Sequence, residues 1–255
     1  MDFLSKADMN THERVVVAHQ PNFIPWAGYF YKMVYADCFI ILDEVQFTKG
    51  GYINRVKIRQ GNSSSWLTVP VSLPDRQAAI KDVTICPRAF SRKHLNTLRQ
   101  TYARAPYLKP VLQLIADAYD SGYERLLDLN LHLLNSIIEY IGLKCSFVLQ
   151  SELVTEGHSN EMLAGLAAQL SATMYVAGNG ARNYTEGQEH LYHSRGLSVA
   201  YHKFSMPVYE QIHGDFVGGC SIIDAMMNLG PDAIQILKLQ QNPPFVTSSE
   251  LAKAV

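Results

Sequence analysis

The fold is decided by residues 14–42, which read RVVVAHQPNFIPWAGYFYKMVYADCFIIL. Arg14–Val17 contains three consecutive valines, which are β-branched and apolar and predict a short buried strand, and a turn follows at Gln20-Pro21-Asn22. A helix is predicted from Trp26 to about Ala36, and Phe39–Leu42 is a second apolar run of strand length. Two strands joined by a short helix form a βαβ unit, so the sequence predicts a parallel sheet.

The second half of the chain repeats this alternation of strands and helices. We predict strands at Phe147–Leu149, Met174–Ala177 and Val199–His202. Helices at Glu161–Leu170 and Glu186–Ser194 are expected to connect them. The tail after Asn242 is expected to be mobile.

The region between these two halves changes pattern twice. Tyr52–Ile58 and Trp66–Val71 alternate like half-buried strands, and then apolar residues recur at helical spacing over about 89–143. We therefore expect one α/β domain over residues 1–255, with a mainly parallel sheet, flanking helices and a helical insertion at about 89–143. Two helices are predicted near the C-terminus, at Ser221–Asn228 and Pro231–Leu239.

The composition is that of an ordinary globular protein, with 47 % hydrophobic and 18 % charged residues. The net charge of −1 gives no overall attraction to nucleic acid or to an anionic membrane, so neither partner is expected. The four cysteines form no C-x-x-C pair, which argues against a zinc site or a disulfide framework. The polar N-terminus does not resemble a signal peptide, and no apolar run is long enough to span a bilayer. We therefore expect a cytoplasmic protein without a membrane-inserted segment.

The first candidate site follows the first predicted strand. His19 and Gln20 lie at its carboxyl end, where open parallel sheets bind their ligands. Two prolines fix the backbone that follows, and Trp26 and Gly28 stand at the start of the next helix. The alternative interpretation is a rigid turn in which His19 is buried and bonded to the backbone.

The second candidate site follows the second predicted strand, at the same edge of the sheet. Asp43 and Glu44 are paired acids that could serve as a general base, as metal ligands or as acceptors for ribose hydroxyls. Gln46 lies two residues further on and could orient a substrate.

A local basic cluster comes next in this otherwise neutral chain. In a strand, Arg55, Lys57 and Arg59 share one face, and Lys49 precedes them. Such a stripe suits a diphosphate or triphosphate, because arginine gives two parallel hydrogen bonds to phosphate. A solvated strand face is the alternative. Asn54 stands beside this cluster.

A third candidate is the loop that follows the strand at Met174–Ala177. It contains Gly178 and Gly180, with Tyr184 in the helix after it. A single G-x-G is a weak signal, because it lacks the third glycine of a dinucleotide-binding fingerprint. The chain has no G-x-S-x-G elbow and no Walker loop, which argues against a serine hydrolase and a P-loop NTPase.

Several of these segments together resemble the WbqC-like protein family, and the resemblance covers nearly the whole chain. Ala177 and Met206 depart from the family's pattern, where serine and histidine are usual, which puts a histidine-bearing lid at Met206 in doubt. The matching segments are His19-Gln20-Pro21, Pro25-Trp26-x-Gly28-Tyr29-Phe30-x-Lys32, Asp43-x-Val45-Gln46-Phe47-x-Lys49, Asn54-Arg55, Gly178-x-Gly180-Ala181-x-x-Tyr184, Pro207-Val208-Tyr209-x-Gln211 and Ser221-Ile222-Ile223-Asp224.

The resemblance implies a role in bacterial O-antigen or other surface-glycan biosynthesis. Members of the family have been proposed to transfer glycine or another acyl group onto an amino sugar. The pattern of the first 60 residues is also similar to nucleotidylyl-transferase-like folds, some of which activate a carboxylate with ATP. Trp26 and Tyr29 replace the histidines of the H-x-G-H signature of those folds, so this similarity concerns the fold alone.

We therefore predict an amide-forming transferase whose partners are an acyl or amino-acid donor and a nucleotide-linked amino sugar, with ATP and Mg²⁺ as the cofactors this chemistry would use. His19 and Asp43 are the predicted catalytic residues. A non-catalytic nucleotide-sugar binding module and a metal-dependent hydrolase that uses Asp43, Glu44 and His19 as ligands are the alternatives. The predicted substrate-binding residues are Gln20, Trp26, Gln46, Lys49, Asn54, Arg55, Lys57, Gly178, Gly180 and Tyr184.

Overall fold

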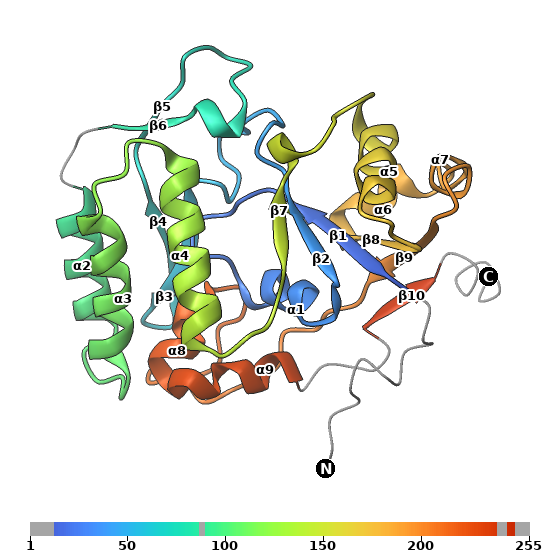
Figure 1. Cartoon of the computed structure of the whole chain (residues 1–255). Coiled ribbons are helices and arrows are strands. Elements are labelled where there is room, and N and C mark those ends of the chain that lie inside the picture. Colours follow the sequence, from blue (N-terminus) through green and yellow to red (C-terminus); the bar gives the residue numbers. More distant parts are fainter. Residues whose placement is uncertain (1–12, 87–89, 239–243, 248–255) are drawn as a thin grey trace.

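The computed structural model describes residues 13–86, 90–238 and 244–247, except for the side chains of Asn179, Asn183 and Tyr184. Its centre is a six-stranded sheet with flanking helices, as the sequence predicts (Figure 1). The strands lie in the order β10-β9-β8-β1-β2-β7, and all neighbours are parallel except β10 and β9. The strands are β1 (Val15–His19), β2 (Cys38–Ile41), β7 (Phe147–Leu149), β8 (Met174–Ala177), β9 (Ser198–His202) and β10 (Phe245–Thr247).

The strand order decides where a ligand site is expected. Along the chain, β1, β2 and β7 add outward on one side, and β8, β9 and β10 then add on the other side of β1. The order therefore reverses between β1 and β8. In open α/β sheets, ligands bind in the crevice outside the carboxyl ends of the strands at such a reversal.

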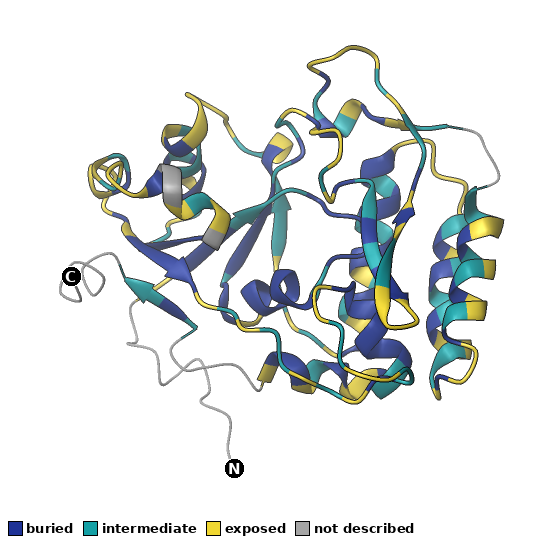
Figure 2. Ribbon diagram, turned by 180° about the vertical axis from the view of Figure 1, so that it is seen from behind, coloured by how far each residue is buried: buried dark blue, intermediate teal, exposed yellow. Residues whose placement is uncertain are grey.

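The central strands bury side chains on both faces, which explains why they read as continuous apolar runs. On β1, Val15 and Val17 pack into one core cluster, whereas Val16 packs into the other. The first cluster includes helices α1 (Ala27–Tyr35), α8 (Ile222–Leu229) and α9 (Ile234–Lys238), and the second includes α5 (Ser159–Gln169). Figure 2 shows the sheet and α1 as mostly buried, with exposed residues on the peripheral helices.

The chain between β2 and β7 forms the predicted hairpin and helical segment. A hairpin of β3 (Arg55–Gln60) and β4 (Ser63–Thr68) makes a separate antiparallel sheet. The remaining elements of this part are the small sheet of β5 (Val71–Ser72) and β6 (Thr84–Ile85), the 3-10 helix η2 (Ile80–Asp82), and the helices α2 (Phe90–Thr101), α3 (Leu108–Asp120) and α4 (Leu126–Tyr140).

Two predictions about the second half need correction. The helix expected at Glu186–Ser194 is the shorter α7 (His190–His193), because Gly187 lies before it in the left-handed region at φ 86°. In the tail after Asn242, Phe245–Thr247 form strand β10, which pairs antiparallel with β9. The other elements here are η3 (Gln150–Glu152), η4 (Asn179–Ala181), α6 (Arg182–Thr185), α7 (His190–His193) and η5 (Gly230–Ala233).

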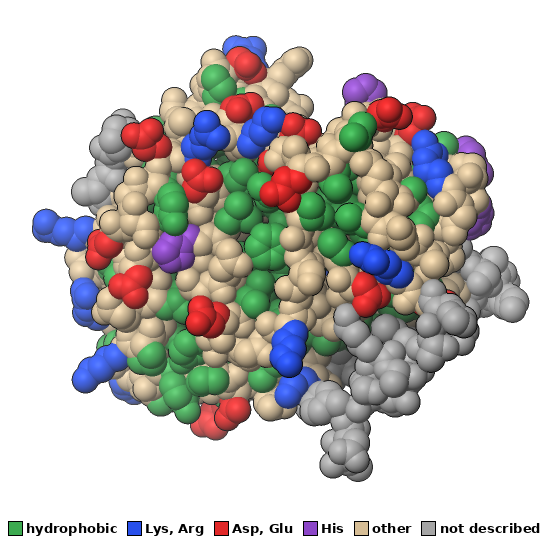
Figure 3. Space-filling model, viewed as in Figure 1, with side chains coloured by type: hydrophobic (Ala, Val, Ile, Leu, Met, Phe, Trp, Pro, Cys, Tyr) green, Lys and Arg blue, Asp and Glu red, His purple; other side chains and the backbone are tan. Residues whose placement is uncertain are grey.

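The described residues give the protein a mixed surface. On the face shown in Figure 3, acidic and basic side chains are interspersed rather than gathered by sign. All four cysteines are free thiols, with Cys38 and Cys220 buried. Within the described ranges, no helix combines the length and the hydrophobicity that crossing a bilayer requires.

Candidate functional site

A cavity of about 440 Å³ lies at the carboxyl ends of the strands where the strand order reverses. His19 from the end of β1, Gly178 after β8 and His202 from the end of β9 line it. Helix α1 contributes Lys32, and Trp26 stands just before that helix. We call this the smaller cavity.

Lys32 is the unusual side chain of the smaller cavity. It belongs to a helix of which every residue except Val34 is buried, and only 5 % of Lys32 itself is exposed. Among the described residues none gives its ammonium a hydrogen bond or an ion pair, and burial alone lowers its pKa to about 8. At neutral pH the smaller cavity therefore contains a buried positive charge.

His19 is neutral and has a defined orientation. Its Nδ1 lies 3.1 Å from the carbonyl oxygen of Gln20, and because a carbonyl only accepts, Nδ1 carries the proton. Burial and the nearby Lys32 lower the pKa of His19 to about 3. The Nε2 atom of His19 is thus left as a proton acceptor in the smaller cavity.

His202 is also neutral, and one of its nitrogens lacks a partner. Burial, followed by the charge of Lys32, lowers its pKa to about 3. Its Nδ1 lies 2.7 Å from the Tyr35 hydroxyl, whereas its buried Nε2 has no hydrogen-bond partner among the described residues. An unpaired buried nitrogen costs free energy until a ligand supplies the missing partner.

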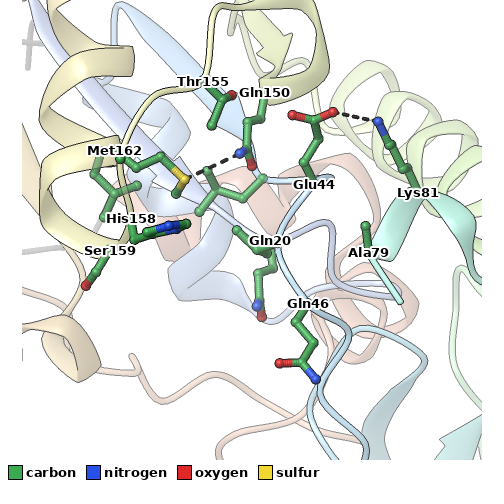
Figure 4. Close-up of a pocket in the computed structure, with 14 residues that line it drawn as sticks. Gln20, Glu44, Gln46, Ala79, Lys81, Gln150, Thr155, His158, Ser159 and Met162 are labelled. Carbon is green, nitrogen blue, oxygen red and sulfur yellow. Dashed lines mark hydrogen bonds and ion pairs between the residues drawn. The ribbon is translucent and has the colours of Figure 1, made fainter. Parts of the chain in front are cut away.

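A second cavity, of about 950 Å³, adjoins the first at the same edge of the sheet. We call it the larger cavity. The two cavities share Gln20, Leu42 and Leu163. Figure 4 shows amide, hydroxyl and imidazole groups around the larger cavity, and an ion pair of 2.5 Å between Glu44 and Lys81 at its rim. Such a lining suits a polyhydroxylated ligand.

The structure brings about half of the predicted site residues together. Gln20 lines both cavities, and Gln46 lines the larger one, where its amide also donates to the carbonyl oxygen of Arg76 at 3.0 Å. The side chain of Tyr184 lies outside the described residues. The residues that line the smaller cavity as predicted are His19, Gln20, Trp26, Gly178 and Gly180.

Asp43 has different surroundings from His19. It is 1 % exposed, and its two carboxylate oxygens accept hydrogen bonds from the backbone and the hydroxyl of Ser151, at 3.0 and 2.7 Å. Asp43 does not appear among the residues that line either cavity. Its carboxylate ties the end of β2 to the segment after β7.

The predicted cationic stripe lines neither of these two cavities. Lys49 is exposed, and the guanidinium of Arg55 lies 4.1 Å from the centre of the Trp66 ring. The Lys57 ammonium lies 5.5 Å from the same ring. Neighbouring Asn54 donates to the carbonyl oxygen of Val69 at 2.9 Å, which fixes the hairpin. These side chains therefore shape the β3–β4 hairpin in the described structure.

Arg59 corrects the prediction most clearly, because it is fully buried. It donates to the side chain of Gln211 and to the carbonyl oxygen of His213, residues about 150 positions away. The Gln211 amide in turn donates to Asp224 at 2.7 Å. Asp224 also accepts from the Tyr209 hydroxyl at 2.6 Å. Arg59 thus belongs to a buried polar network that we call the Asp224 network.

The loop between β1 and α1 is held by hydrogen bonds from two distant segments. Asn130 from α4 donates to the carbonyl oxygen of Pro21 at 2.8 Å, and the Ser221 hydroxyl donates to that of Ile24 at 2.7 Å. Ile24 has φ 41°, a left-handed conformation that is rare for a β-branched residue. Such strain persists only where surrounding contacts enforce it, as it does at many functional sites.

Lys32 and His202 are not among the site residues predicted from the sequence. The available signal was a single lysine inside an otherwise apolar helix, because a helix that is apolar on all sides is buried and so is any charge within it. His202 is the last residue of a predicted strand and lies at the same sheet edge as His19. Their convergence on one cavity needed the three-dimensional structure.

The metal-hydrolase interpretation required Asp43, Glu44 and His19 to act together. The structure does not assemble them, since Glu44 pairs with Lys81 and Asp43 with Ser151. In the part of the chain that the structure describes, no three His, Cys, Asp or Glu side chains come together as a possible metal site.

Gly28 controls the position of Trp26 at the mouth of the smaller cavity. A Cβ at residue 28 would lie 2.3 Å from two ring carbons of Trp26, so Gly28→Ala should displace the indole. In a Trp66→Phe background, where Trp26 is the remaining tryptophan, we expect Gly28→Ala to shift its fluorescence emission. Gly165→Ala, which meets nothing within 4 Å, is the matched control, and an unchanged spectrum for Gly28→Ala would contradict the prediction.

The chain is similar to a known protein family and to a curated relative. The family model of the WbqC-like protein family matches residues 20–236, which include most of both cavities. An uncharacterized protein of Mycobacterium tuberculosis (strain ATCC 25618 / H37Rv), Rv1507c, is 31 % identical over 222 residues, covering 86 % of this chain and 95 % of the relative. No solved structure matches the chain significantly.

Proposed function

Because the chain belongs to the WbqC-like protein family, we propose that it is a cytoplasmic transferase that forms an amide between an acyl group, such as glycine, and a nucleotide-linked amino sugar. One observation carries this proposal. Two cavities meet at the carboxyl edge of the sheet, they share Gln20, and the adjacent His19 offers an unprotonated nitrogen. Two adjoining cavities suit a reaction between two substrates.

His19 supplies the group that such a reaction needs. The amine nitrogen of the sugar bonds to the acyl carbon, and the bond from that carbon to the leaving group of an acyl phosphate or acyl nucleotide breaks. The leaving group keeps the electron pair of that bond, and the amine proton passes to Nε2 of His19. Positioned proton acceptors contribute about 10²- to 10⁴-fold to the rate, most when their pKa lies near the working pH, so His19, whose pKa is lowered to about 3, is expected at the lower end of this range.

Lys32 and the larger cavity support the same reaction. A buried ammonium stabilises negative charge that develops on the acyl oxygen during attack, and it does so more strongly in a water-poor site than in solvent. The hydroxyl and amide groups of the larger cavity are suited to a sugar. We assign the sugar to the larger cavity and the acyl group to the smaller one.

The described residues that line the two cavities lack the group of cations that a triphosphate such as ATP needs. A triphosphate needs several cations, but Lys49, Arg55 and Lys57 line neither cavity, and Lys81 is paired with Glu44. The proposed reaction therefore starts from an acyl donor that is already activated. The doubly wound strand order supports the further proposal that the sheet is nucleotidylyl-transferase-like.

The test is a reaction with purified full-length protein. It is incubated with glycine, with and without ATP and Mg²⁺, and with a panel of nucleotide-linked amino sugars, and products are identified by mass. A second series replaces glycine and ATP with a preformed acyl phosphate. An amide product that requires the protein supports the proposal, whereas the absence of such a product in every combination contradicts it.

A further inference from the structure

The unpaired ammonium of Lys32 indicates which chemical group the smaller cavity receives. From this geometry we infer that the smaller cavity binds one carboxylate group of a substrate. The inference rests on the proposed function only in assigning this carboxylate to the acyl donor in its free-acid form. The binding site itself rests on the buried ammonium of Lys32, on Nε2 of His202 and on the space that Gly178 leaves.

The described lining of the smaller cavity contributes a single positive charge, that of Lys32. Lys32 is the cation among its lining residues, and it is almost wholly buried. Both lining histidines are neutral at physiological pH. One buried positive charge is balanced by one negative charge, whereas a diphosphate would leave excess negative charge in a poorly solvated space. The charge balance therefore favours a carboxylate over a diphosphate.

Nε2 of His202 is available as a second hydrogen-bond donor. When the Tyr35 hydroxyl donates to Nδ1 of His202, the proton of the neutral imidazole resides on Nε2. This Nε2 is the buried atom without a partner among the described residues. A carboxylate has two acceptor oxygens, so it can pair with the Lys32 ammonium and also provide the acceptor that Nε2 lacks.

Gly178 leaves space beside the ammonium of Lys32. A Cβ at residue 178 would lie 3.0 Å from Nζ of Lys32, so only glycine leaves this approach to the ammonium open. Gly180 also lines the smaller cavity, yet a Cβ there would meet nothing within 4 Å. The two glycines therefore form a matched pair of test positions.

The experiment measures binding to the full-length protein by isothermal titration calorimetry. The probes are acetate, glycine, inorganic phosphate and pyrophosphate. We expect saturable binding of acetate or glycine to the wild type, at least tenfold weaker binding to Lys32→Met, and no change for Lys93→Met, which removes an exposed lysine. Gly178→Ala should also weaken binding, whereas Gly180→Ala should not.

The stability of Lys32→Met separates a binding role from a structural one. Replacing a buried unpaired charge by an apolar side chain of similar length should leave the melting temperature unchanged or raise it. Weaker binding together with a lower melting temperature would overturn the inference, because Lys32 would then be a structural residue. Tighter binding of pyrophosphate than of acetate and glycine, or equal binding by wild type and Lys32→Met, would also overturn it.

The pH dependence of carboxylate binding provides an independent readout. Binding requires protonated Lys32, whose pKa in the free protein is lowered to about 8, so affinity should fall about tenfold per pH unit above pH 8. The other titratable groups around it are His19, His202, Tyr175, and Tyr31 and Tyr35 on its own helix. Burial lowers the pKa of both histidines to about 3 and raises that of Tyr31 to about 12 and that of Tyr35 well above its usual value. A slope that persists in Lys32→Met would contradict the assignment to Lys32.

The two proposals can fail separately. Carboxylate binding that depends on Lys32, without any amide product, would leave the site standing and reject the transferase. Amide formation that is unaffected by Lys32→Met would support the transferase and reject the carboxylate site.

Discussion

Replacing His19 by alanine is expected to lower the turnover of amide formation about 10²-fold, the lower end of the range for a positioned proton acceptor, as suits an imidazole whose pKa is about 3. The reason is that Nε2 of His19 takes the proton of the attacking amine, and the nearby Asp43 is engaged by Ser151 and cannot replace it. Affinity for the acceptor sugar should change much less, because the larger cavity stays intact. The measurement is kcat and KM from product mass, compared between wild type and variant.

The matched control for His19→Ala is His193→Ala, which removes an exposed histidine from α7. Its kinetics should equal those of the wild type. A His19→Ala variant that retains full turnover would show that another group accepts the proton. If the wild type binds the sugar but never forms an amide, the family fold here serves as a binding module, and His19→Ala has no turnover to lose.

Replacing Asp224 by alanine is expected to cause the largest loss of stability, about 3–5 kcal/mol in the free energy of unfolding. Asp224 is fully buried and accepts hydrogen bonds from the hydroxyls of Tyr102 and Tyr209 and from the amide of Gln211. Alanine would leave these donors unpaired and would remove the negative charge that Gln211 links to buried Arg59. Urea denaturation monitored by circular dichroism measures the change.

Asp232→Ala is the control for this variant, since Asp232 is an exposed aspartate in the neighbouring 3-10 helix. It should change the free energy of unfolding by no more than about 0.5 kcal/mol. Similar unfolding curves for Asp224→Ala and Asp232→Ala would show that the Asp224 network adds little to stability.

The sequence predicted the strands well because their physical signal is local. Val15–Val17 and Phe39–Ile41 are short apolar runs that suit strands buried on both faces, and the structure confirms both. The placement of His19 and Gln20 at a cavity followed from the same reasoning, because the carboxyl ends of parallel strands share one edge.

For the basic cluster, the sequence predicts the strand but not what surrounds its side chains. The period of a strand correctly relates Arg55, Lys57 and Arg59 to one another, but it does not say what covers their face. Gln211 and His213 bury Arg59 from about 150 residues away, and Trp66 on the partner strand lies beneath Arg55. The residue types at positions 55, 57 and 59 do not indicate either contact.

The role of Lys32 was hidden for a related reason. Its apolar neighbours predict a buried helix, and the structure confirms that burial. Whether a buried lysine meets a carboxylate, a carbonyl or an empty cavity depends on the strands that end opposite it. Those strands, β8 and β9, come more than 140 residues later in the chain.

The hydrogen bonds that hold Pro21–Pro25 have a consequence for biosynthesis. Ser221 and Ile222, which fix the carbonyl oxygens of Ile24 and Pro25, leave the ribosome almost 200 residues after the loop itself. A nascent chain therefore carries His19 for most of its synthesis without the conformation that presents it. Nascent chains arrested before Ser221 should lack a working pocket. A protein divided into two fragments, one with the Pro21–Pro25 loop and one with Ser221, should regain the pocket only when both fragments reassociate.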